Sequence, residues 1–441
     1  MMRTDTPDKK TLKKATWRTY LLALLFDLLA LAANQLAIHS STFADAYSHY
    51  VYRVLSLGIG SVMGLLPFSV VELLLYATIF FVLFDFVKQL RRAVRVGAAC
   101  VHPARVSQAS RTHAEASTNS KNVASSTESQ QHTGAACPTH LLAAVARPLL
   151  RFLGHLFLIL SSLLVLYVFL CGINYHRTSF SEEAGLSVTI DAHGTVYDEA
   201  DLIALCDYLV TEINDTEAQL DVPYIGQTSE TPKPSAAWLW HAGRTGQRAM
   251  EKLGQRYRRL SGHYPFPKPI LNTWILSVQQ TTGVYSPFTV EANYNRDIAY
   301  YDIPFTICHE LSHLRGYMQE EEANFIGVLA TIGADDLYFN YSGYVSAWVY
   351  AGNALARIDS TAFATLYSRI NARTRQDMLY NNAYWQQFEG KPAEAHEQLN
   401  DAYLKMQGQA SGVRSYGHVT DLMLEYFAKN GTLTQSQGLK N

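Results

Sequence analysis

The stretch "TICHELSHLRGYMQEEEANF" (306–325) concentrates residue types that could bind a metal ion and use it for hydrolysis. His309, Glu310 and His313 form an H-E-x-x-H pattern. On a helix, residues four apart lie on one face, so both imidazoles can reach the same ion. Glu310 projects beside them, where it can accept a proton from a water that zinc acidifies. The pattern predicts a catalytic Zn²⁺ site with Glu310 as the general base.

The third protein ligand must come from elsewhere, and three consecutive acids follow the histidines: Glu320, Glu321 and Glu322. If a second helix begins near Glu320, Asn324 lies on the same face one turn later. We therefore expect Glu320 to bind the metal and Asn324 to hydrogen-bond a liganding histidine. Glu321 would point among apolar groups, and Glu322 can stay solvated. Glu321 and a distant acid such as Glu291 remain alternative ligands.

The elements around the motif favour a buried helix with defined ends. Pro304 suits its first turn and Gly316 its C-terminal cap. Apolar neighbours such as Ile307 and Leu311 argue against an ordinary surface helix, because buried polar groups need partners. Gln319 stands where a metzincin has its third histidine, so the pattern indicates the glutamate-zincin type.

Three apolar runs precede this region, at about 19–40, 68–87 and 152–173. As helices, all three are long enough to cross a bilayer. The chain is 48% apolar with a formal net charge of −2, so it gives no sign of a nucleic-acid partner. The expected partners are the lipid bilayer and a peptide or protein substrate, and the oligomeric state stays open.

Basic residues beside the runs predict their orientation. Six precede the first run, four follow the second, and only Arg53 lies between those two runs. The positive-inside rule then places the N-terminus and the 88–151 loop in the cytoplasm and everything after about 174 outside it. "ALAAN" resembles a signal-peptide cleavage site, but we expect the first run to be retained as an anchor.

The expected organisation is a membrane region at 1–174 and an extracytoplasmic domain at 175–441. A segment at about 101–139, rich in Ser, Thr, Ala and Gln, is expected to be a disordered cytoplasmic loop. Helical periodicity dominates the outer domain, at about 198–219, 235–260, 304–315, 320–333, 341–357, 360–390, 393–407 and 415–429. Residues 186–198 look like a strand or hairpin, and one or two short strands are expected before residue 295. The fold class is thus mainly α with a small mixed sheet.

Polar residues within the apolar runs and the cysteines add smaller expectations. Ser69 and Glu72 form an S-x-x-E capping box that starts the second membrane helix. Asp27, Glu72 and Asp85 are intramembrane acids and hence candidates for a functional role. The five cysteines are too scattered for a disulfide framework and are expected to be structural thiols, with pairing of Cys206 and Cys308 left open.

Four segments in this order, "GVYSPFTVEANYN", "PFTICHELSHLRGYMQEEEANF", "YFNYSGY" and "SYGHVTDLML", resemble an uncharacterised family of bacterial membrane proteins. That family has a short multi-pass region and a predicted glutamate-zincin peptidase domain. The helix with E-x-x-A-[DN] is more distantly similar to membrane-bound zinc proteases. Their pattern implies that Glu320 is the ligand, with Asn324 at a position where those relatives usually have Asp.

The resemblance also implies a substrate-binding edge strand and an oxyanion-stabilising side chain. The segment 283–295 is the expected strand, and its candidate substrate-binding residues are Tyr285, Pro287, Phe288, Glu291 and Asn293. Candidates for the oxyanion are Tyr341, Tyr344, Tyr416 and His418.

Together these features predict a membrane-anchored zinc metallopeptidase that hydrolyses peptide bonds with a metal-activated water. Two alternatives stay open: a non-catalytic membrane sensor or scaffold with a structural zinc site, and an amidase acting on cell-wall peptides. The substrate and regulation are not determined by the sequence.

Overall fold

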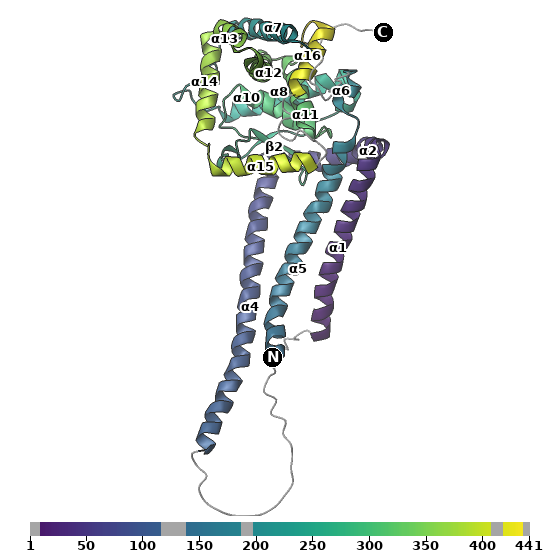
Figure 1. Ribbon diagram of the computed structural model, residues 1–441, viewed down its shortest axis with the longest axis vertical. Coiled ribbons are helices and arrows are strands. Elements are labelled where there is room, and N and C mark those ends of the chain that lie inside the picture. Colours follow the sequence, from purple (N-terminus) through teal and green to yellow (C-terminus); the bar gives the residue numbers. More distant parts are fainter. Residues whose placement is uncertain (1–8, 116–137, 187–196, 407–417, 435–441) are drawn as a thin grey trace, which may run out of the picture. The chain divides into compact units, whose positions relative to one another are not determined.

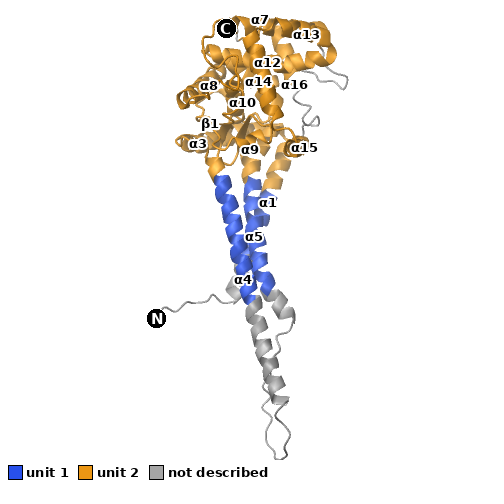
Figure 2. Ribbon diagram, turned by 90° about the vertical axis from the view of Figure 1, so that its left-hand side faces the viewer, with its two compact units in different colours: residues 1–29, 74–165 blue, residues 30–73, 166–441 orange. Residues whose placement is uncertain are grey.

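The computed structural model describes residues 9–115, 138–186, 197–406 and 418–434. They fall into two compact units, one of residues 1–29 and 74–165 and the other of residues 30–73 and 166–441 (Figure 2). The predicted fold class is confirmed: the chain is mainly helical, with a small mixed sheet and three long apolar helices near the N-terminus.

The long helices are α1 (Lys9–His39), α4 (Val70–Glu115) and α5 (Pro138–Leu170) (Figure 1). Trp17–His39, Val70–Val96 and Val145–His176 are long and apolar enough to cross a membrane, as predicted from the three runs. In the first unit, Asp85 lies 2.8 Å from Nδ1 of His155 and accepts a hydrogen bond from Gln89, so this intramembrane acid has polar partners.

Both ends of the predicted loop at about 101–139 belong to helices. α4 continues to Glu115 and α5 begins at Pro138, while residues 116–137 lie outside the described part of the chain. α4 thus includes 101–115, and disorder of the loop stays a prediction. Alanine and arginine in this stretch are good helix formers, and adding residues to an existing helix costs less than nucleating a new one.

The second unit holds the remaining helices. These are α2 (Ser41–Tyr47), η1 (Ser48–Tyr52), α3 (Arg53–Gly64), η2 (Gly172–His176), α6 (Phe180–Glu183), α7 (Glu199–Ala218), α8 (Ala236–Arg256), η3 (Arg258–Leu260), α9 (Trp274–Ser277), α10 (Asp302–His313), α11 (Glu320–Ile332), α12 (Leu337–Ile358), α13 (Ser360–Arg369), α14 (Ala372–Gln386), α15 (Lys391–Met406) and α16 (His418–Asn430). Most match the predicted ranges within a few residues. The possible strand or hairpin at 186–198 falls almost entirely on 187–196, which lie outside the described residues.

The predicted helix at 360–390 is two helices, α13 and α14. The chain bends at Asn371, where the side chain of Asn214 on α7 donates to the carbonyl of Arg369 and accepts from the amide of Asn371. These bonds satisfy backbone groups that the break leaves without helical partners. A distant side chain thus supports a bend that local periodicity does not reveal.

The sheet consists of β1 (Lys268–Pro269), β2 (Gly283–Ser286) and β3 (Glu291–Tyr294), in the order β1-β3-β2. β1 runs parallel to β3, and β2 runs antiparallel to it. β3 is therefore the central strand, and β2 has one edge without a strand partner in the sheet.

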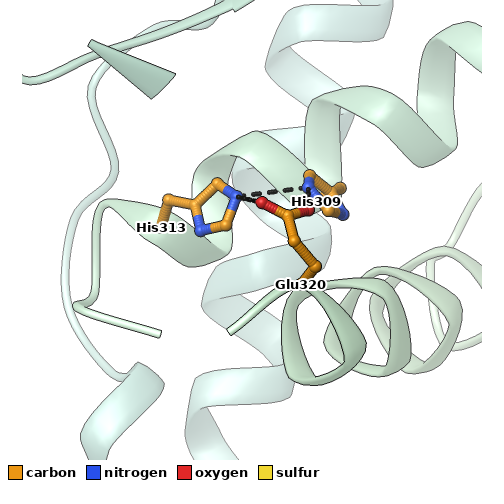
Figure 3. Close-up of side chains that lie close together, drawn as sticks. All are labelled: His309, His313 and Glu320. Carbon is orange, nitrogen blue, oxygen red and sulfur yellow. Dashed lines mark hydrogen bonds and ion pairs between the residues drawn. The ribbon is translucent and has the colours of Figure 1, made fainter. Parts of the chain in front are cut away.

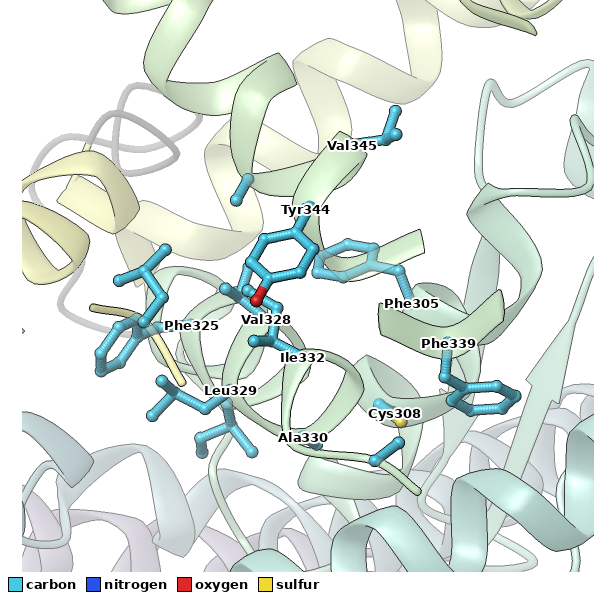
Figure 4. Close-up of a cluster of buried hydrophobic side chains, with 14 of the residues drawn as sticks. Phe305, Cys308, Phe325, Val328, Leu329, Ala330, Ile332, Phe339, Tyr344 and Val345 are labelled. Carbon is cyan, nitrogen blue, oxygen red and sulfur yellow. The ribbon is translucent and has the colours of Figure 1, made fainter. Parts of the chain in front are cut away.

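The core of the second unit packs α10 against α11, with α12 beside both. Figure 4 shows buried side chains from these helices, including Phe305, Phe325 and Leu329. At Gly327 of α11 an added Cβ would lie 3.1 Å from the Phe305 ring and 3.4 Å from the amide of His309. The missing side chain is what lets α11 approach the helix that carries H-E-x-x-H.

The first turn of α4 carries Glu72, whose carboxylate ties the helix to the segment that follows β1. Ser69 Oγ accepts the Glu72 amide at 3.4 Å, which is the N-cap half of the predicted capping box. The Glu72 carboxylate accepts the amides of Leu271 and Asn272 at 2.8 and 3.0 Å. Glu72 is thus a structural clamp, and the hypothesis of a functional intramembrane acid at this position is unnecessary.

A second carboxylate completes this clamp from the sheet. Glu291 accepts the amides of Val70 and Val71 at 3.1 and 2.9 Å, at the positive end of α4. Lys268 Nζ lies 2.5 Å from the same carboxylate, and both side chains are at most 2% exposed. Both carboxylate oxygens of Glu291 are engaged by these contacts, and Glu291 is not part of the metal cluster. The alternative that Glu291 is the third zinc ligand is therefore wrong.

We expect Glu291→Gln to lower the stability of the full-length protein by about 3 kcal/mol, because the substitution leaves the Lys268 charge buried without its counter-charge. Thermal unfolding in detergent measures the effect, with Glu230→Gln at an exposed position as the control. Equal Tm values for Glu291→Gln and wild type would contradict the assignment of this pair as structural.

Candidate metal centre

The helix α10 and the turn after it bring the two halves of the motif together. Pro304 lies in the first turn of α10, as predicted, where its missing N–H breaks no helical bond. Gly316 has φ +82°, a left-handed conformation that favours glycine, and its amide donates to the carbonyl of His313. The chain then reverses into α11, which begins at Glu320.

His309, His313 and Glu320 converge, and their donor atoms all lie within 4.8 Å of one another (Figure 3). The two Nε2 atoms are 3.2 Å apart, and the Glu320 carboxylate oxygens lie 3.3 Å from Nε2 of His309 and 3.9 Å from Nε2 of His313. Tetrahedral zinc with bonds of about 2.0–2.1 Å separates its ligand atoms by about 3.3 Å. The three residues therefore fit one such ion, and this group could hold a metal.

Each imidazole is prepared differently. His313 Nδ1 lies 2.7 Å from the carbonyl oxygen of Tyr317, which can only accept a hydrogen bond. Nδ1 therefore carries the hydrogen, and Nε2 keeps the lone pair with which it can bind a metal. Burial lowers the pKa of His313 to about 4. Burial also acts to lower the pKa of His309, but the Glu320 carboxylate outweighs it and the net pKa is raised. A metal bound at this site would displace the proton that His309 carries in its charged form.

Glu310 is held apart from hydrogen-bond donors. Its side chain is buried, and its Oε2 has no hydrogen-bond partner among the described residues. Burial raises the pKa of Glu310 to about 8, His309 opposes this shift and Glu320 adds to it. An added Cβ at Gly283 of β2 would lie 2.5 Å from Glu310 Oε1, so the strand passes directly over this carboxylate.

The other acids and the asparagine near the motif occupy different places. Asn324 is buried beside His309, and its side chain acts to raise the pKa of His309 through a hydrogen bond. The Nδ2 atom of Asn324 has no hydrogen-bond partner among the described residues. Glu321 lies outside the metal cluster. The expectation that Glu322 stays solvated is wrong: it is 4% exposed and accepts the amide of Phe180 at 2.6 Å. It is buried because Phe180 packs into the core beside α11.

A cavity of about 1080 Å³ opens onto the cluster. Its walls include β2, the facing side of α10, the start of α11, and α15. Two of the predicted substrate-binding residues, Tyr285 and Pro287, line it, whereas Phe288 does not. Asn293 is also misassigned, since it lies buried in the central strand with its amide bonded to backbone carbonyls.

Three of the four residues named for oxyanion stabilisation are described by the structure, and these three are not in the cavity wall. Tyr341 is buried and donates to Asp377 at 2.7 Å, and Tyr344 packs against the ring of Tyr208. His418 begins α16 away from the cavity, and Tyr416 lies outside the described residues. Tyr341, Tyr344 and His418 were candidates because they lie in the segments that carry the family resemblance. Their place in these segments does not bring them into the cavity wall.

Sequence reasoning missed a tyrosine cluster in the cavity wall. The hydroxyl of Tyr403 lies 2.9 Å from those of both Tyr167 and Tyr175, and all three residues line the cavity. Cys171 lies beside them with its Sγ 3.7 Å from the sulfur of Met318. The only sequence signal was an excess of tyrosine, which does not specify which rings meet.

Asp302, also in the cavity wall, makes stability depend on pH. Burial raises its pKa to about 7, and Asp377 adds to the shift. Because its pKa is higher in the folded state, Asp302 contributes to the stability of the fold in its protonated form. This contribution is fully present below the unfolded-state pKa of about 3.9 and is lost as the pH rises through 7. We expect Tm to fall between about pH 4 and 8, and Asp302→Asn to remove at most about 4 kcal/mol of this loss.

The measurement for Asp302 is thermal unfolding at several pH values, with Asp335→Asn, whose carboxylate is 85% exposed, as the control. Parallel curves for wild type and Asp302→Asn would contradict the prediction.

Comparisons with known proteins give a family but no described function. Residues 139–424, which include all of α5 but its first residue and His309, His313 and Glu320, match the family described as "Protein of unknown function (DUF3810)". No curated protein and no solved structure matches the chain. Because the match spans well over half of the sequence, the chain belongs to this family.

Proposed function

We propose that this protein is a membrane-anchored zinc metallopeptidase of the glutamate-zincin type. The observation that carries the proposal is the placement of Glu310 next to three converging metal-ligating side chains, with its Oε2 buried and lacking a hydrogen-bond partner among the described residues. A buried carboxylate without partners is costly, and such groups concentrate at catalytic sites. The cavity beside it is large enough for a peptide segment.

In this proposal His309, His313 and Glu320 hold zinc, which when bound supplies Lewis acidity for water and the substrate carbonyl. Glu310 takes a proton from the attacking water and then gives it to the departing amine nitrogen. Glu310 suits both roles because it directly follows the ligand His309 on the helix and lines the cavity, where its carboxylate can accept and return a proton.

The geometry supports a catalytic site over a structural one. Structural zinc sites are closed by four protein ligands, whereas the described residues offer three, with the cavity beside them. A structural site also has no use for a buried base next to the metal. These two features favour the peptidase over the sensor or scaffold hypothesis.

The unpaired edge of β2 supports a peptide as substrate. β2 lines the cavity, and among the described strands its one partner is β3, so an extended chain can add to its other edge through backbone hydrogen bonds. Tyr285 of this strand has its ring centroid 6.0 Å from that of His313, which places the strand beside the metal ligands.

We expect Gly283→Ala to lower peptide hydrolysis at least about tenfold without loss of zinc, because the new Cβ would lie 2.5 Å from Glu310 Oε1 and displace the base or the strand. Initial rates and zinc content are measured together. Gly58→Ala, at a helical glycine where an added Cβ would meet nothing within 4 Å, is the control. Full activity of Gly283→Ala would contradict this placement of Glu310.

The direct experiment is an assay of purified full-length protein in detergent against a library of quenched fluorescent peptides. The proposal predicts cleavage that a chelator abolishes and zinc restores. Cleavage that persists after complete zinc removal, or that the Glu310→Gln variant retains, would refute it.

We also propose that the N-terminus and the 88–151 loop are cytoplasmic and that the domain from 175 onward is extracytoplasmic. The proposal rests on the basic residues that flank the apolar runs. Labelling of single introduced cysteines in intact cells with a membrane-impermeant thiol reagent tests it, and labelling of the 88–151 loop would contradict it.

A further inference from the structure

A second cavity, separate from the metal centre, is lined by arginines. Arg53, Arg177, Arg259 and Arg315 contribute to its wall, and Asp45 is the one carboxylate among its lining residues. Its interior measures about 20 Å³, more than a single water requires. The hollow is small, and most of the charged groups in its wall are guanidinium cations.

The positive charge in this cavity is only partly neutralised by the described carboxylates. Arg259 pairs with Asp45 at 3.1 Å and with Glu183 at 3.8 Å. In the described part of the chain, the other three arginines form no ion pair with a carboxylate within 4.0 Å, and two of them, Arg53 and Arg315, approach each other. An added Cβ at Gly262 would lie 3.3 Å from Nη2 of Arg315 and 3.4 Å from Nη2 of Arg53.

The three unpaired arginines are held in place by backbone carbonyls instead. Arg177 donates to the carbonyl of Arg315 at 2.7 Å, and Arg53 donates to that of Ser261 at 3.0 Å. Arg315 donates to the carbonyl of His263 and is only 5% exposed. The Nε atoms of Arg177 and Arg315 are buried without a hydrogen-bond partner among the described residues. Arg177 and Arg315 also stack on the rings of Tyr317 and Tyr264, and an anion would add charge-assisted hydrogen bonds to these contacts.

The helical segment that forms one wall has two chemically different faces. Ser48, His49, Tyr52, Arg53 and Ser56 line the cavity. The intervening side chains of Tyr50, Val51 and Val54 are 72%, 44% and 66% exposed. An apolar surface therefore runs directly beside the arginine cavity, as in helices that lie at a membrane surface.

The chain places this cavity near the ends of two membrane spans. The span Trp17–His39 ends two residues before α2 begins, and Arg177 directly follows the span Val145–His176. The boundary between hydrocarbon and water, where lipid phosphates lie, falls at such positions.

We propose that this cavity binds the phosphate group of an anionic membrane lipid, with the acyl chains lying along the exposed apolar face of η1 and α3. Arginine is suited to phosphate because its planar donors bind two oxygens at once. A lipid satisfies both halves of the surface, the unpaired guanidinium groups and the uncovered valines. A free phosphate ion would satisfy only the first.

The test uses delipidated full-length protein in detergent and measures the affinity for short-chain phosphatidylglycerol. Matched phosphatidylcholine and inorganic phosphate are the comparison ligands. We expect saturable binding of phosphatidylglycerol that Arg53→Gln and Arg177→Gln each weaken at least about tenfold, since one charge-assisted bond is worth about 1.5–3 kcal/mol. Arg248→Gln, an exposed arginine on α8, is the matched control.

Equal affinity of wild type and Arg53→Gln for phosphatidylglycerol would overturn the proposal. So would equal affinity for phosphatidylcholine, or tighter binding of inorganic phosphate than of the lipid. Both variants alter partly exposed side chains, and circular dichroism checks that they fold. The readout is lipid affinity, so it does not depend on zinc or on peptidase activity.

Discussion

Replacing Glu310 by glutamine is expected to lower kcat for peptide hydrolysis by about 10³-fold, the middle of the range for loss of a general base. The amide keeps the size of the side chain but cannot take a proton from water. Zinc content should not change, because Glu310 is not among the three converging ligands. Steady-state rates and elemental analysis of the same preparation measure both quantities.

The matched control for Glu310→Gln is Glu230→Gln, an exposed acid outside the cavity wall and the metal cluster. It should keep near-normal activity. If Glu310→Gln retained more than about a tenth of wild-type kcat, the role of Glu310 as base would be wrong, since general bases contribute about 10²–10⁴-fold.

The second large effect concerns the third ligand. We expect Glu320→Gln to weaken zinc binding by more than about 100-fold, which exceeds the 10–100-fold losses typical of groups that only orient a ligand. Asn324→Ala should fall within that smaller range. Competition titration with a chromophoric chelator measures both affinities in full-length protein.

Glu321→Gln is the natural control for Glu320→Gln, because it removes the neighbouring carboxylate and leaves the cluster intact. Zinc affinity should also rise with pH, since the raised pKa of His309 means that a proton competes with the metal. A larger loss of affinity for Glu321→Gln than for Glu320→Gln would reverse the assignment of the ligand.

The parts of this site that could be predicted from sequence are those fixed by local geometry. His309 and His313 meet because one helical turn separates them, and Glu320 joins them because Gly316 allows the chain to turn back after α10. These relations span about a dozen residues. Periodicity within single segments likewise predicted most of the helices.

The parts that could not be predicted depend on distant partners. Glu291 resembled a ligand or a substrate-binding residue until its contacts with Lys268 and the start of α4 were known, 23 and more than 200 residues away in sequence. Tyr167 and Tyr403 meet across 236 residues. No local pattern identifies such pairs, because tertiary packing alone brings them together.

The most direct test of the central claim is the metal content of purified full-length protein. Elemental analysis of wild type, loaded with zinc and then dialysed, should give one zinc per chain. The double variant His309→Ala/His313→Ala should give none, while Arg248→Gln should match wild type. A metal-free wild-type protein, or a double variant that still holds one zinc, would contradict the account.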